Sequence, residues 1–393
     1  MHSKFKLSNK IKIMIMSFTS MLMIGIVNNL RGQIGPLIMD DFALNYSQLG
    51  FLFSFLSIGA IIIFFLSGKM IEKYGLINIF LYGLVHTAVS LLAVYLSSGY
   101  YYLLISFFSI SMGLTLLNIV SVTVISMSFS QRRGKMINLL HLFYGLGGII
   151  SPYFVTLILK MGFSWAHSFL FSLIFIVIII IQYKSSRLPE FEASKSQSML
   201  STKKLLKNKA VILFSLLVFL QVGVEFSLVT WLAPFLKDVQ FRTEIVISFF
   251  LSLFFISFTF GRLLASIIIE KVNYYDFLIY TQIGGALVIL AALLVGRPLT
   301  ILLSLSGLFF AVQVPTSQAI ILDIFGSSGI KVVGFTQTAG TMGAAFLSNW
   351  IIGFTNDLFG VESSFVIVII LLLSLVVITI YLKEITKGDF LNN

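Results

Sequence analysis

Glu225 is the residue whose chemistry stands out, because its carboxyl lies deep inside a long apolar stretch of sequence. Gln221 precedes it by one helical turn and shares its face of a helix. An apolar environment favours the neutral form of a carboxyl, so Glu225 can take up and release a proton near neutral pH. This predicts proton coupling or contact with a substrate. The alternative is a structural carboxyl that pairs with Arg31 or with backbone groups.

Arg31 is a permanent charge expected inside an apolar stretch, and three roles are open to it. Its guanidinium can bind a carboxylate or phosphate of a ligand through two parallel hydrogen bonds. It can instead neutralise Glu225, or extend along its helix to the outer surface of a membrane. The sequence leaves these three interpretations open.

Amides and hydroxyls recur at helical spacing in other apolar stretches, as in Asn118 with Ser111 and Thr115. An unpartnered amide in lipid is costly, so these side chains should face a cavity or another helix. A sugar fits such a lining when aromatic rings cover its apolar face, and Tyr144 and Trp231 lie near these stripes. Trp231 is alternatively an anchor at the membrane interface. The predicted substrate-binding residues are Asn28, Arg31, Asn118, Tyr144, Gln221, Trp231, Gln313 and Gln337.

His141 is a second candidate for proton coupling, since an imidazole titrates near neutral pH. It shares a helical face with Asn138 and Gly145, close to one end of its apolar stretch. A hydrogen bond between helices is therefore the alternative role.

The composition excludes most other kinds of protein. Of the 393 residues, 58% are apolar and 10% are charged, and the mean hydropathy is +1.03. Soluble domains carry about 25% charged residues, so a soluble enzyme or a nucleic-acid binder is excluded. There is no Cys, the four His are scattered, and no phosphate-binding loop motif occurs. The sequence therefore predicts no cofactor, no metal site and no catalytic residues.

Twelve stretches are long and apolar enough to cross a membrane, for which roughly 20 residues are needed. The first six cover about 12–38, 47–68, 76–97, 101–129, 136–159 and 164–183. The second six cover about 210–236, 245–269, 275–296, 299–322, 331–355 and 362–382. We therefore expect an all-α membrane protein with twelve transmembrane helices, organised as residues 1–183, a basic linker 184–209, and residues 210–393.

The basic residues predict the orientation. Most of the 26 Lys and Arg fall in both termini, the central linker and alternate loops, while Lys160, Lys237, Arg242 and Arg297 fall on the other side. Positive loops stay in the cytoplasm, so both termini and the linker are expected there. The net charge of +11 has this origin and needs no nucleic acid.

The two halves of the sequence repeat each other. A shift of 198 residues places Gly25 on Gly223, Pro36 on Pro234, Asp40 on Asp238, and Glu72 with Lys73 on Glu270 with Lys271. A shift of 195 residues places Gly145 on Gly340 and Gly148 on Gly343. Because six spans separate equivalent positions, the sequence predicts two pseudo-symmetric six-helix lobes of the same topology.

Gly68, Glu72, Lys73 and Gly75 resemble the Gly-x-x-x-Asp-Arg-x-Gly loop of the major facilitator transporters, with Glu and Lys in place of Asp and Arg. By that resemblance these four residues are expected to act in the conformational switch. Within the superfamily the chain resembles the fucose–glucose proton-symporter branch, on three strings: Asn138–Gly148 with Pro152, Gly223–Ser227 with Trp231, and Pro315-Thr316 with Gly334, Gly340 and Gly343. That branch usually carries an acidic residue in its first or fourth span, where this sequence has Asn28, Asn29 and Asn118.

These observations predict a secondary transporter in the cell membrane that moves a small polar solute, in first place a sugar, with protons. Export of a drug-like or anionic compound is the alternative, and Arg31 is its support. An intramembrane enzyme lacks a nucleophile–base or metal motif here, and a non-transporting sensor would typically carry a soluble domain. The expected partners are the substrate, protons and the lipid bilayer, and a monomer is expected.

Overall fold

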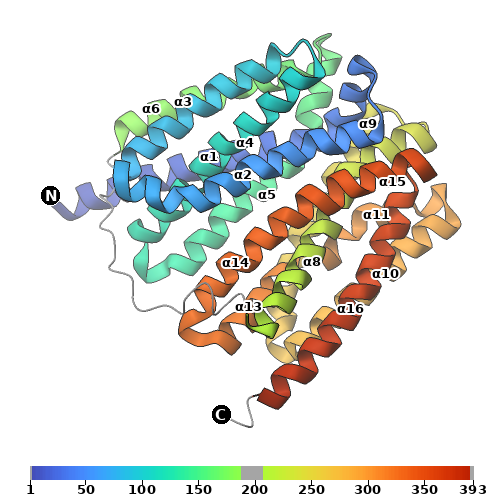
Figure 1. Cartoon of the computed structure of the whole chain (residues 1–393). Coiled ribbons are helices and arrows are strands. Elements are labelled where there is room, and N and C mark those ends of the chain that lie inside the picture. The colour runs from blue at the N-terminus through green and yellow to red at the C-terminus, as the bar shows by residue number, and fades with distance from the viewer. Residues whose placement is uncertain (1, 187–206, 390–393) are drawn as a thin grey trace. The chain divides into compact units, whose positions relative to one another are not determined.

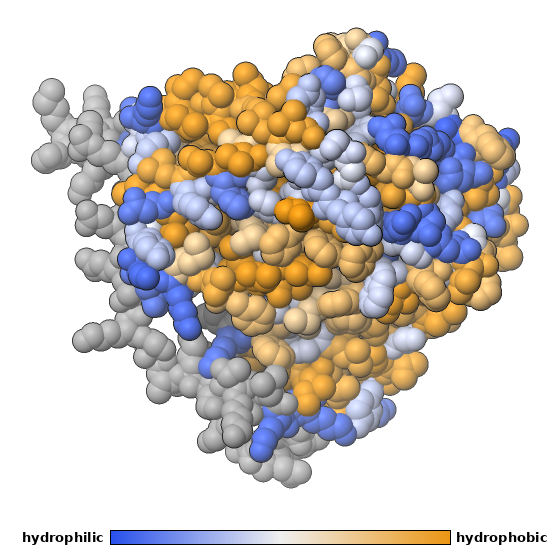
Figure 2. Space-filling model, turned by 45° about the horizontal axis from the view of Figure 1, so that its top comes forward, coloured by the Kyte–Doolittle hydropathy of each residue, from blue (hydrophilic) through white to orange (hydrophobic). Residues whose placement is uncertain are grey.

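A computed structural model describes residues 2–186 and 207–389, and nearly all of them are helical. Within these ranges eleven helices are long and apolar enough to cross a membrane (Figure 1). Apolar side chains cover much of the face drawn in Figure 2. In lipid a backbone must satisfy its own polar groups, and a helix does so within one segment. The protein is therefore a multi-pass membrane protein.

The chain divides into two units. The first comprises Met1–Ala43 and Phe55–Ser194, and the second comprises Leu44–Ser54 and Lys195–Asn393. Most of the linker predicted at 184–209 lies outside the described residues. Residues 44–54, at the start of α2, are grouped with the second unit.

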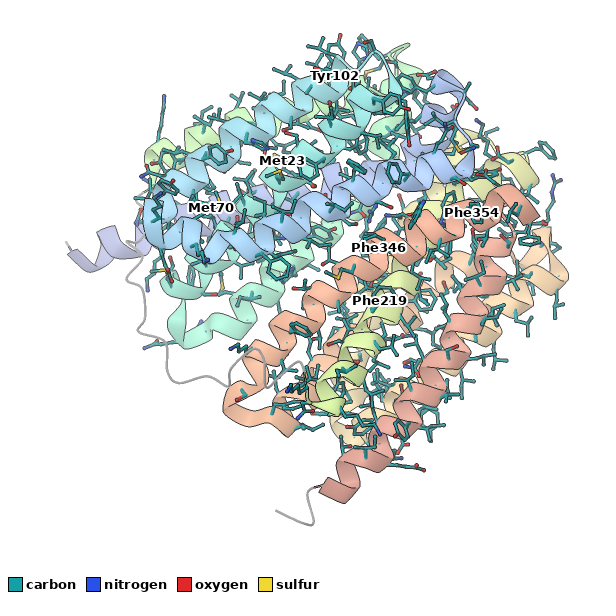
Figure 3. The ribbon with its side chains drawn as sticks, viewed as in Figure 1. Met23, Met70, Tyr102, Phe219, Phe346 and Phe354 are labelled. Atoms are coloured by element: carbon teal, nitrogen blue, oxygen red, sulfur yellow. The ribbon has the colours of Figure 1, made fainter. Side chains whose placement is uncertain are left out.

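The first unit contains five complete helices and the larger part of a sixth. They are α1 (His2–Phe42), α2 (Tyr46–Tyr74, from Phe55 onward), α3 (Leu76–Tyr95), α4 (Tyr100–Ser128), α5 (Arg133–Lys160) and α6 (His167–Ser185), with a short turn η1 (Ser130–Arg132) before α5. Met23 of α1 is buried, whereas Tyr102 near the start of α4 is exposed (Figure 3).

Small residues let α1 and α5 pack backbone to backbone. A Cβ on Gly25 would lie 2.2 Å from the carbonyl oxygen of Tyr144, and one on Gly147 would lie 2.5 Å from that of Leu22. Ser151 Oγ donates a hydrogen bond of 2.8 Å to the carbonyl oxygen of Ile26. In membranes, where lipid and side chain are equally apolar, such close approach is a main source of helix association.

The second unit contains the start of α2 and the helices from α8 to α16. They are α8 (Lys209–Pro234), η2 (Phe235–Val239), α9 (Glu244–Ile268), η3 (Ile269–Lys271), α10 (Tyr274–Val295), η4 (Arg297–Leu299), α11 (Ile301–Leu305), α12 (Gly307–Phe310), α13 (Gln313–Phe325), η5 (Gly326–Ser328), α14 (Gly329–Met342), η6 (Gly343–Ile351), α15 (Ile352–Phe359) and α16 (Ser363–Asp389). Phe219, Phe346 and Phe354 mark α8, η6 and α15 in Figure 3.

The span predicted at 331–355 is a composite of three helical segments. It begins as α14, continues through the π-helix η6, and ends as α15. A π-helix shifts the hydrogen bonds from i→i+4 to i→i+5 and is frequent at functional sites. This composite segment is not among the eleven long apolar helices of the described residues.

The pairing of helices repeats between the units. Where α1 meets α5 in the first unit, α8 meets α14 and η6 in the second. A Cβ on Gly343 would lie 2.0 Å from the carbonyl oxygen of Phe219, and one on Gly223 would lie 2.7 Å from the side chain of Leu347. Gly25 and Gly223, which the repeat aligns, thus both lie at these helix crossings.

Candidate functional site

A buried hydrogen bond joins α8 to α13 in the second unit. Gln221 Nε2 donates to Ser317 Oγ at 3.0 Å, and Ser317 Oγ donates to Gln221 Oε1 at 3.1 Å. Gln221 is 2% exposed, so this pair is shielded from water. Both polar atoms of the Gln221 amide are therefore used between helices, as is common for amides in membrane proteins.

The Gln221–Ser317 hydrogen bond also shows that Glu225 and Gln313 lie at the same depth along their helices, α8 and α13. These two helices run in opposite directions, because the end of α8 lies near the start of the segment that leads to α13. There Gln240, just after η2, donates a 2.6 Å hydrogen bond to Thr300, which precedes α11. Glu225 follows Gln221 by four residues, and Gln313 precedes Ser317 by four, so each lies about 6 Å along its helix from the bond. Glu225 and Gln313 therefore lie on the same side of this bond along the helix axes. Each also shares a helix face with its neighbour in the bond, Gln221 or Ser317.

Gln313 carries a buried amide whose two polar atoms have no hydrogen-bond partner. The residue is 2% exposed, and neither Nε2 nor Oε1 is bonded. An unsatisfied buried group costs about 1–3 kcal/mol, so native structures retain few of them. An amide offers one acceptor and two donor hydrogens, which suits a hydroxyl-bearing ligand. Glu225, at the same level and half-buried, adds a titratable carboxyl.

We expect Gln313→Met to stabilise the empty protein and to weaken ligand binding. The substitution removes the unsatisfied amide while keeping its approximate volume, so the unfolding midpoint should rise by a few degrees. Gln221→Met is the matched control and should lower the midpoint, because it leaves Ser317 without its partner. Thermal unfolding followed by intrinsic fluorescence measures both. A lower midpoint in Gln313→Met would assign the amide a structural role.

Gln337 and Trp231 occupy different surroundings in the second unit. Gln337 is half-buried in α14, one turn before Gly340, which packs against α8. Trp231 is 0% exposed, and its Nε1 donates a 2.7 Å hydrogen bond to the carbonyl oxygen of Ser348 in η6. In this conformation the indole ties α8 to η6, six residues beyond Glu225.

The first unit holds the other predicted binding residues. Arg31 is 6% exposed, so its side chain is enclosed by protein in this conformation. Asn29 donates a 2.7 Å hydrogen bond from Nδ2 to the carbonyl oxygen of Gly25, whereas Asn28 on α1 is half-buried. Asn118 on α4 is also half-buried.

His141 and Tyr144 lie one turn apart on α5. His141 is exposed and Tyr144 is half-buried. The backbone of Tyr144 forms the close contact with Gly25, so this residue also helps to fix the crossing of α1 and α5. Gly145, next to it, is half-buried.

The predicted conformational-switch residues lie where α2 ends and α3 begins. Gly68, Glu72 and Lys73 are exposed, and the Lys73 ammonium lies 5.0 Å from the centre of the Tyr74 ring. Gly75 has a φ of 79°, a conformation that favours glycine, and it caps α3. The last residue of the motif thus has a local structural reason to be Gly.

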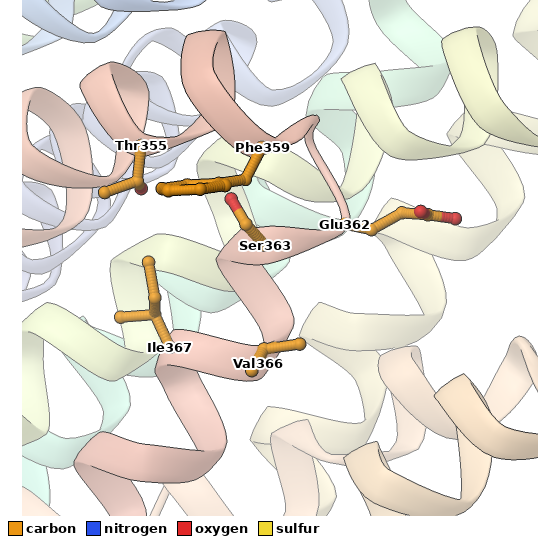
Figure 4. Close-up of a pocket in the computed structure, with 6 residues that line it drawn as sticks. All are labelled: Thr355, Phe359, Glu362, Ser363, Val366 and Ile367. Atoms are coloured by element: carbon orange, nitrogen blue, oxygen red, sulfur yellow. The ribbon is translucent and has the colours of Figure 1, made fainter.

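Sequence reasoning missed three kinds of residue. It did not find Ser317, although Ser317 shares a helix face with Gln313. It set aside Asp238 as a residue at a span end and did not consider Asp357, whose partners lie far away in the chain. It also gave no sign of a groove of about 510 Å³ between α15 and α16, lined by Thr355, Phe359, Glu362, Ser363, Val366 and Ile367. Glu362 points away from the other lining side chains (Figure 4).

The family follows from comparison with known proteins. A family model described as Major Facilitator Superfamily matches residues 13–301. The chain belongs to the Major Facilitator Superfamily. The family and the fold are those of membrane transporters, which agrees with the long apolar helices and the polar groups between them.

Individual known proteins resemble the chain at low sequence identity. The Protein TsgA homolog of Buchnera aphidicola subsp. Schizaphis graminum (strain Sg) is 24% identical over 241 residues, which cover 61% of this chain and 59% of that protein. The nucleoside transporter NupG has a TM-score of 0.79 at 14% identity, covering 95% of this chain and 99% of that one. A D-xylose-proton symporter has a TM-score of 0.78 at 15% identity, covering 95% and 97%. These likenesses establish the fold.

Proposed function

We propose that this Major Facilitator protein is a secondary active transporter that moves a small polar solute, in first place a sugar, across the cell membrane. Protons supply the driving force, and the substrate path opens alternately to each side. The observation that carries the proposal is the unpartnered amide of Gln313, which lies at the level of Glu225 on facing helices. A hydroxylated solute can use the amide as donor and acceptor, while the carboxyl carries the proton.

The proposed topology has twelve membrane spans, with α14, η6 and α15 together forming the eleventh. Both termini lie in the cytoplasm, as the distribution of Lys and Arg predicts. By this orientation the end of α8, the end of α15 and the start of α16 lie on the non-cytoplasmic side. The protein acts as a monomer, and a single chain forms the whole substrate path.

Two structural neighbours support a polar solute, since one is a nucleoside transporter and the other a D-xylose-proton symporter. The resemblance to the fucose–glucose branch points the same way. Export of an anionic or drug-like compound is the second candidate, and the buried guanidinium of Arg31 favours it.

A thermal-shift screen of the purified protein tests the proposal. Sugars are expected to raise the unfolding midpoint, with sugar acids and drug-like compounds as the comparison sets. A compound that stabilises the protein is then followed as radiolabelled substrate in proteoliposomes with an imposed pH gradient. Stabilisation by anions or drugs alone would favour the export alternative. Accumulation without dependence on the pH gradient would reject proton coupling.

A further inference from the structure

Helices α15 and α16 form a hairpin with a groove between them (Figure 4). Gly360, whose φ is 83°, turns the chain from one helix to the other. Thr355 and Phe359 lie one turn apart on α15, and Ser363 and Ile367 lie one turn apart on α16, so each pair shares a helix face. The groove has a volume of about 510 Å³. Ligand pockets measure about 300–1,000 Å³, so this groove has room for a small ligand or an acyl chain.

The hydroxyl groups in the lining already have acceptors. Thr355 Oγ1 donates a 2.8 Å hydrogen bond to a carbonyl oxygen of its own helix, and Ser363 Oγ donates a 2.9 Å hydrogen bond to Asn356 Oδ1. The other side chains inside the groove are apolar, and they are Phe359, Val366 and Ile367. A hydroxylated solute therefore meets no free hydroxyl proton in the lining, whereas an apolar chain needs none.

The groove runs from the membrane interface into the hydrocarbon layer. Phe359 is 76% exposed and Val366 is 50% exposed, so the groove opens on an apolar part of the surface. Ser363 begins a helix of 24 residues, Ser363–Thr386, that is long and apolar enough to cross a membrane. Val366 and Ile367 therefore lie about one turn below the membrane interface, at the depth where acyl chains begin.

The charges around the hairpin are acidic. Glu362 lies at the mouth of the groove and is exposed, and its carboxylate points away from the other lining side chains (Figure 4). Residues 332–382, which contain α15 and most of α16, include no Lys or Arg. A carboxylate here attracts an ammonium group and repels a headgroup that carries only negative charge.

One buried donor beside the groove has no hydrogen-bond partner. Asn356 is 1% exposed, and its Oδ1 accepts hydrogen bonds from Ser363 Oγ and from Ser364 Oγ, whereas its Nδ2 has no partner. Nδ2 and Oδ1 share one carbon atom, so Nδ2 also lies close to Ser363. An ester carbonyl at this level is an acceptor for such a donor. From Glu362 through Asn356 to the apolar lining of α16, the groups follow the order of headgroup, ester and acyl chain in a phospholipid.

We propose that the groove between α15 and α16 binds one phospholipid whose zwitterionic headgroup carries an amine, such as phosphatidylethanolamine. One acyl chain fills the groove, an ester carbonyl lies at the level of Asn356, and the ammonium group lies at Glu362. The groove is formed by the second unit alone. The leaflet, which is the non-cytoplasmic one, rests on the proposed topology.

Photolabelling in proteoliposomes tests the site. The vesicles contain phosphatidylethanolamine and phosphatidylglycerol, with a trace of phosphatidylethanolamine that carries a photoreactive diazirine in its acyl chain. Mass spectrometry of peptides then locates the label. Val85 and Val89 of α3, which are 63% and 61% exposed, serve as the reference for ordinary contact with lipid. We expect residues 355–367 to be labelled about tenfold more than this reference, because a chain in a groove makes many more atomic contacts.

Val366→Trp fills the groove from an exposed position and should lower the labelling of residues 355–367 about tenfold. Ile370→Trp is the matched control, since it adds the same bulk one turn further along α16 at a position that is 56% exposed, and it should leave the labelling unchanged. Unchanged labelling in Val366→Trp, or an equal loss in Ile370→Trp, would overturn the site. If Val366→Trp fails to fold, Phe359→Ala removes an exposed wall of the groove and decides by the same comparison.

The same diazirine chain on phosphatidylglycerol tests the headgroup. The phosphatidylethanolamine probe should label residues 355–367 about threefold more than the phosphatidylglycerol probe, as expected for a single exposed charge pair. Glu362→Lys should remove or reverse this preference. Equal or stronger labelling of the unsubstituted protein by phosphatidylglycerol would reject the assigned headgroup. None of these measurements uses a transported solute, so a failed search for a substrate leaves the lipid site tested.

Discussion

Replacing Glu225 with Gln should abolish uphill, pH-driven accumulation while leaving exchange of labelled for unlabelled substrate largely intact. Gln mimics the protonated carboxyl in shape and hydrogen bonding but cannot titrate. A coupled carrier must return with its proton released, whereas exchange needs only the loaded form to move. Proteoliposomes with an imposed pH gradient measure accumulation, and the same vesicles without a gradient measure exchange.

Glu362→Gln is the control for this prediction, because it neutralises an exposed carboxyl outside the candidate site. It should leave both accumulation and exchange unchanged. Uphill transport that survives in Glu225→Gln would place the coupling group elsewhere, with His141 as the next residue to substitute, or would show a uniporter. Loss of exchange together with accumulation would indicate that Glu225 binds the substrate directly.

Gly25→Leu should destabilise the first unit strongly. A Cβ at this position would lie 2.2 Å from the carbonyl oxygen and 2.9 Å from the carbonyl carbon of Tyr144, which belong to the backbone of α5 and cannot rotate away. Helices α1 and α5 must then separate, and overpacking of this kind costs about 1–3 kcal/mol or more. We expect the unfolding midpoint to fall by about 5 to 10 °C in a thermal unfolding experiment.

The repeat supplies a matched comparison for this substitution. Gly223 is the aligned residue of the second half, but a Cβ there would first meet the side chain of Leu347, at 2.7 Å, which can change its rotamer. Gly223→Leu should therefore cost less than Gly25→Leu. Gly334→Leu should cost least, since a Cβ on Gly334 would meet nothing within 4 Å. An equal loss of stability in all three variants would show that helix propensity or expression, rather than the backbone contact, governs the effect.

Several features of the fold could be predicted because they depend on local composition. A run of about 20 apolar residues has to become a helix in lipid, since only a helix satisfies its backbone within one segment. The long helices α3, α8 and α10 accordingly begin and end within a few residues of the predicted spans. The segment 331–355 differs because η6 changes the hydrogen-bonding pattern, and no feature of composition marks a π-helix.

The candidate site was less predictable. The sequence indicated that Gln221 and Gln313 are polar groups in apolar helices, and it placed Glu225 on the face of Gln221. It did not indicate that the amide of Gln221 is hydrogen-bonded to Ser317, whereas the amide of Gln313 has no hydrogen-bond partner. That distinction depends on which residue of α13 meets which residue of α8. Lipid and protein interiors are equally apolar, so periodicity alone does not show which helix face meets another helix.

The sequence by itself determined that this protein is embedded in a membrane, that its two halves repeat, and that few polar groups lie among many apolar ones. These properties follow from hydropathy and from residue spacing, both of which can be read from local stretches of the sequence. Only the tertiary structure decided that the first turns of α2 join the second unit and that Asp357 caps them. Residues 46 and 357 lie far apart in the chain, and their meeting depends on the packing of several helices rather than on any local pattern.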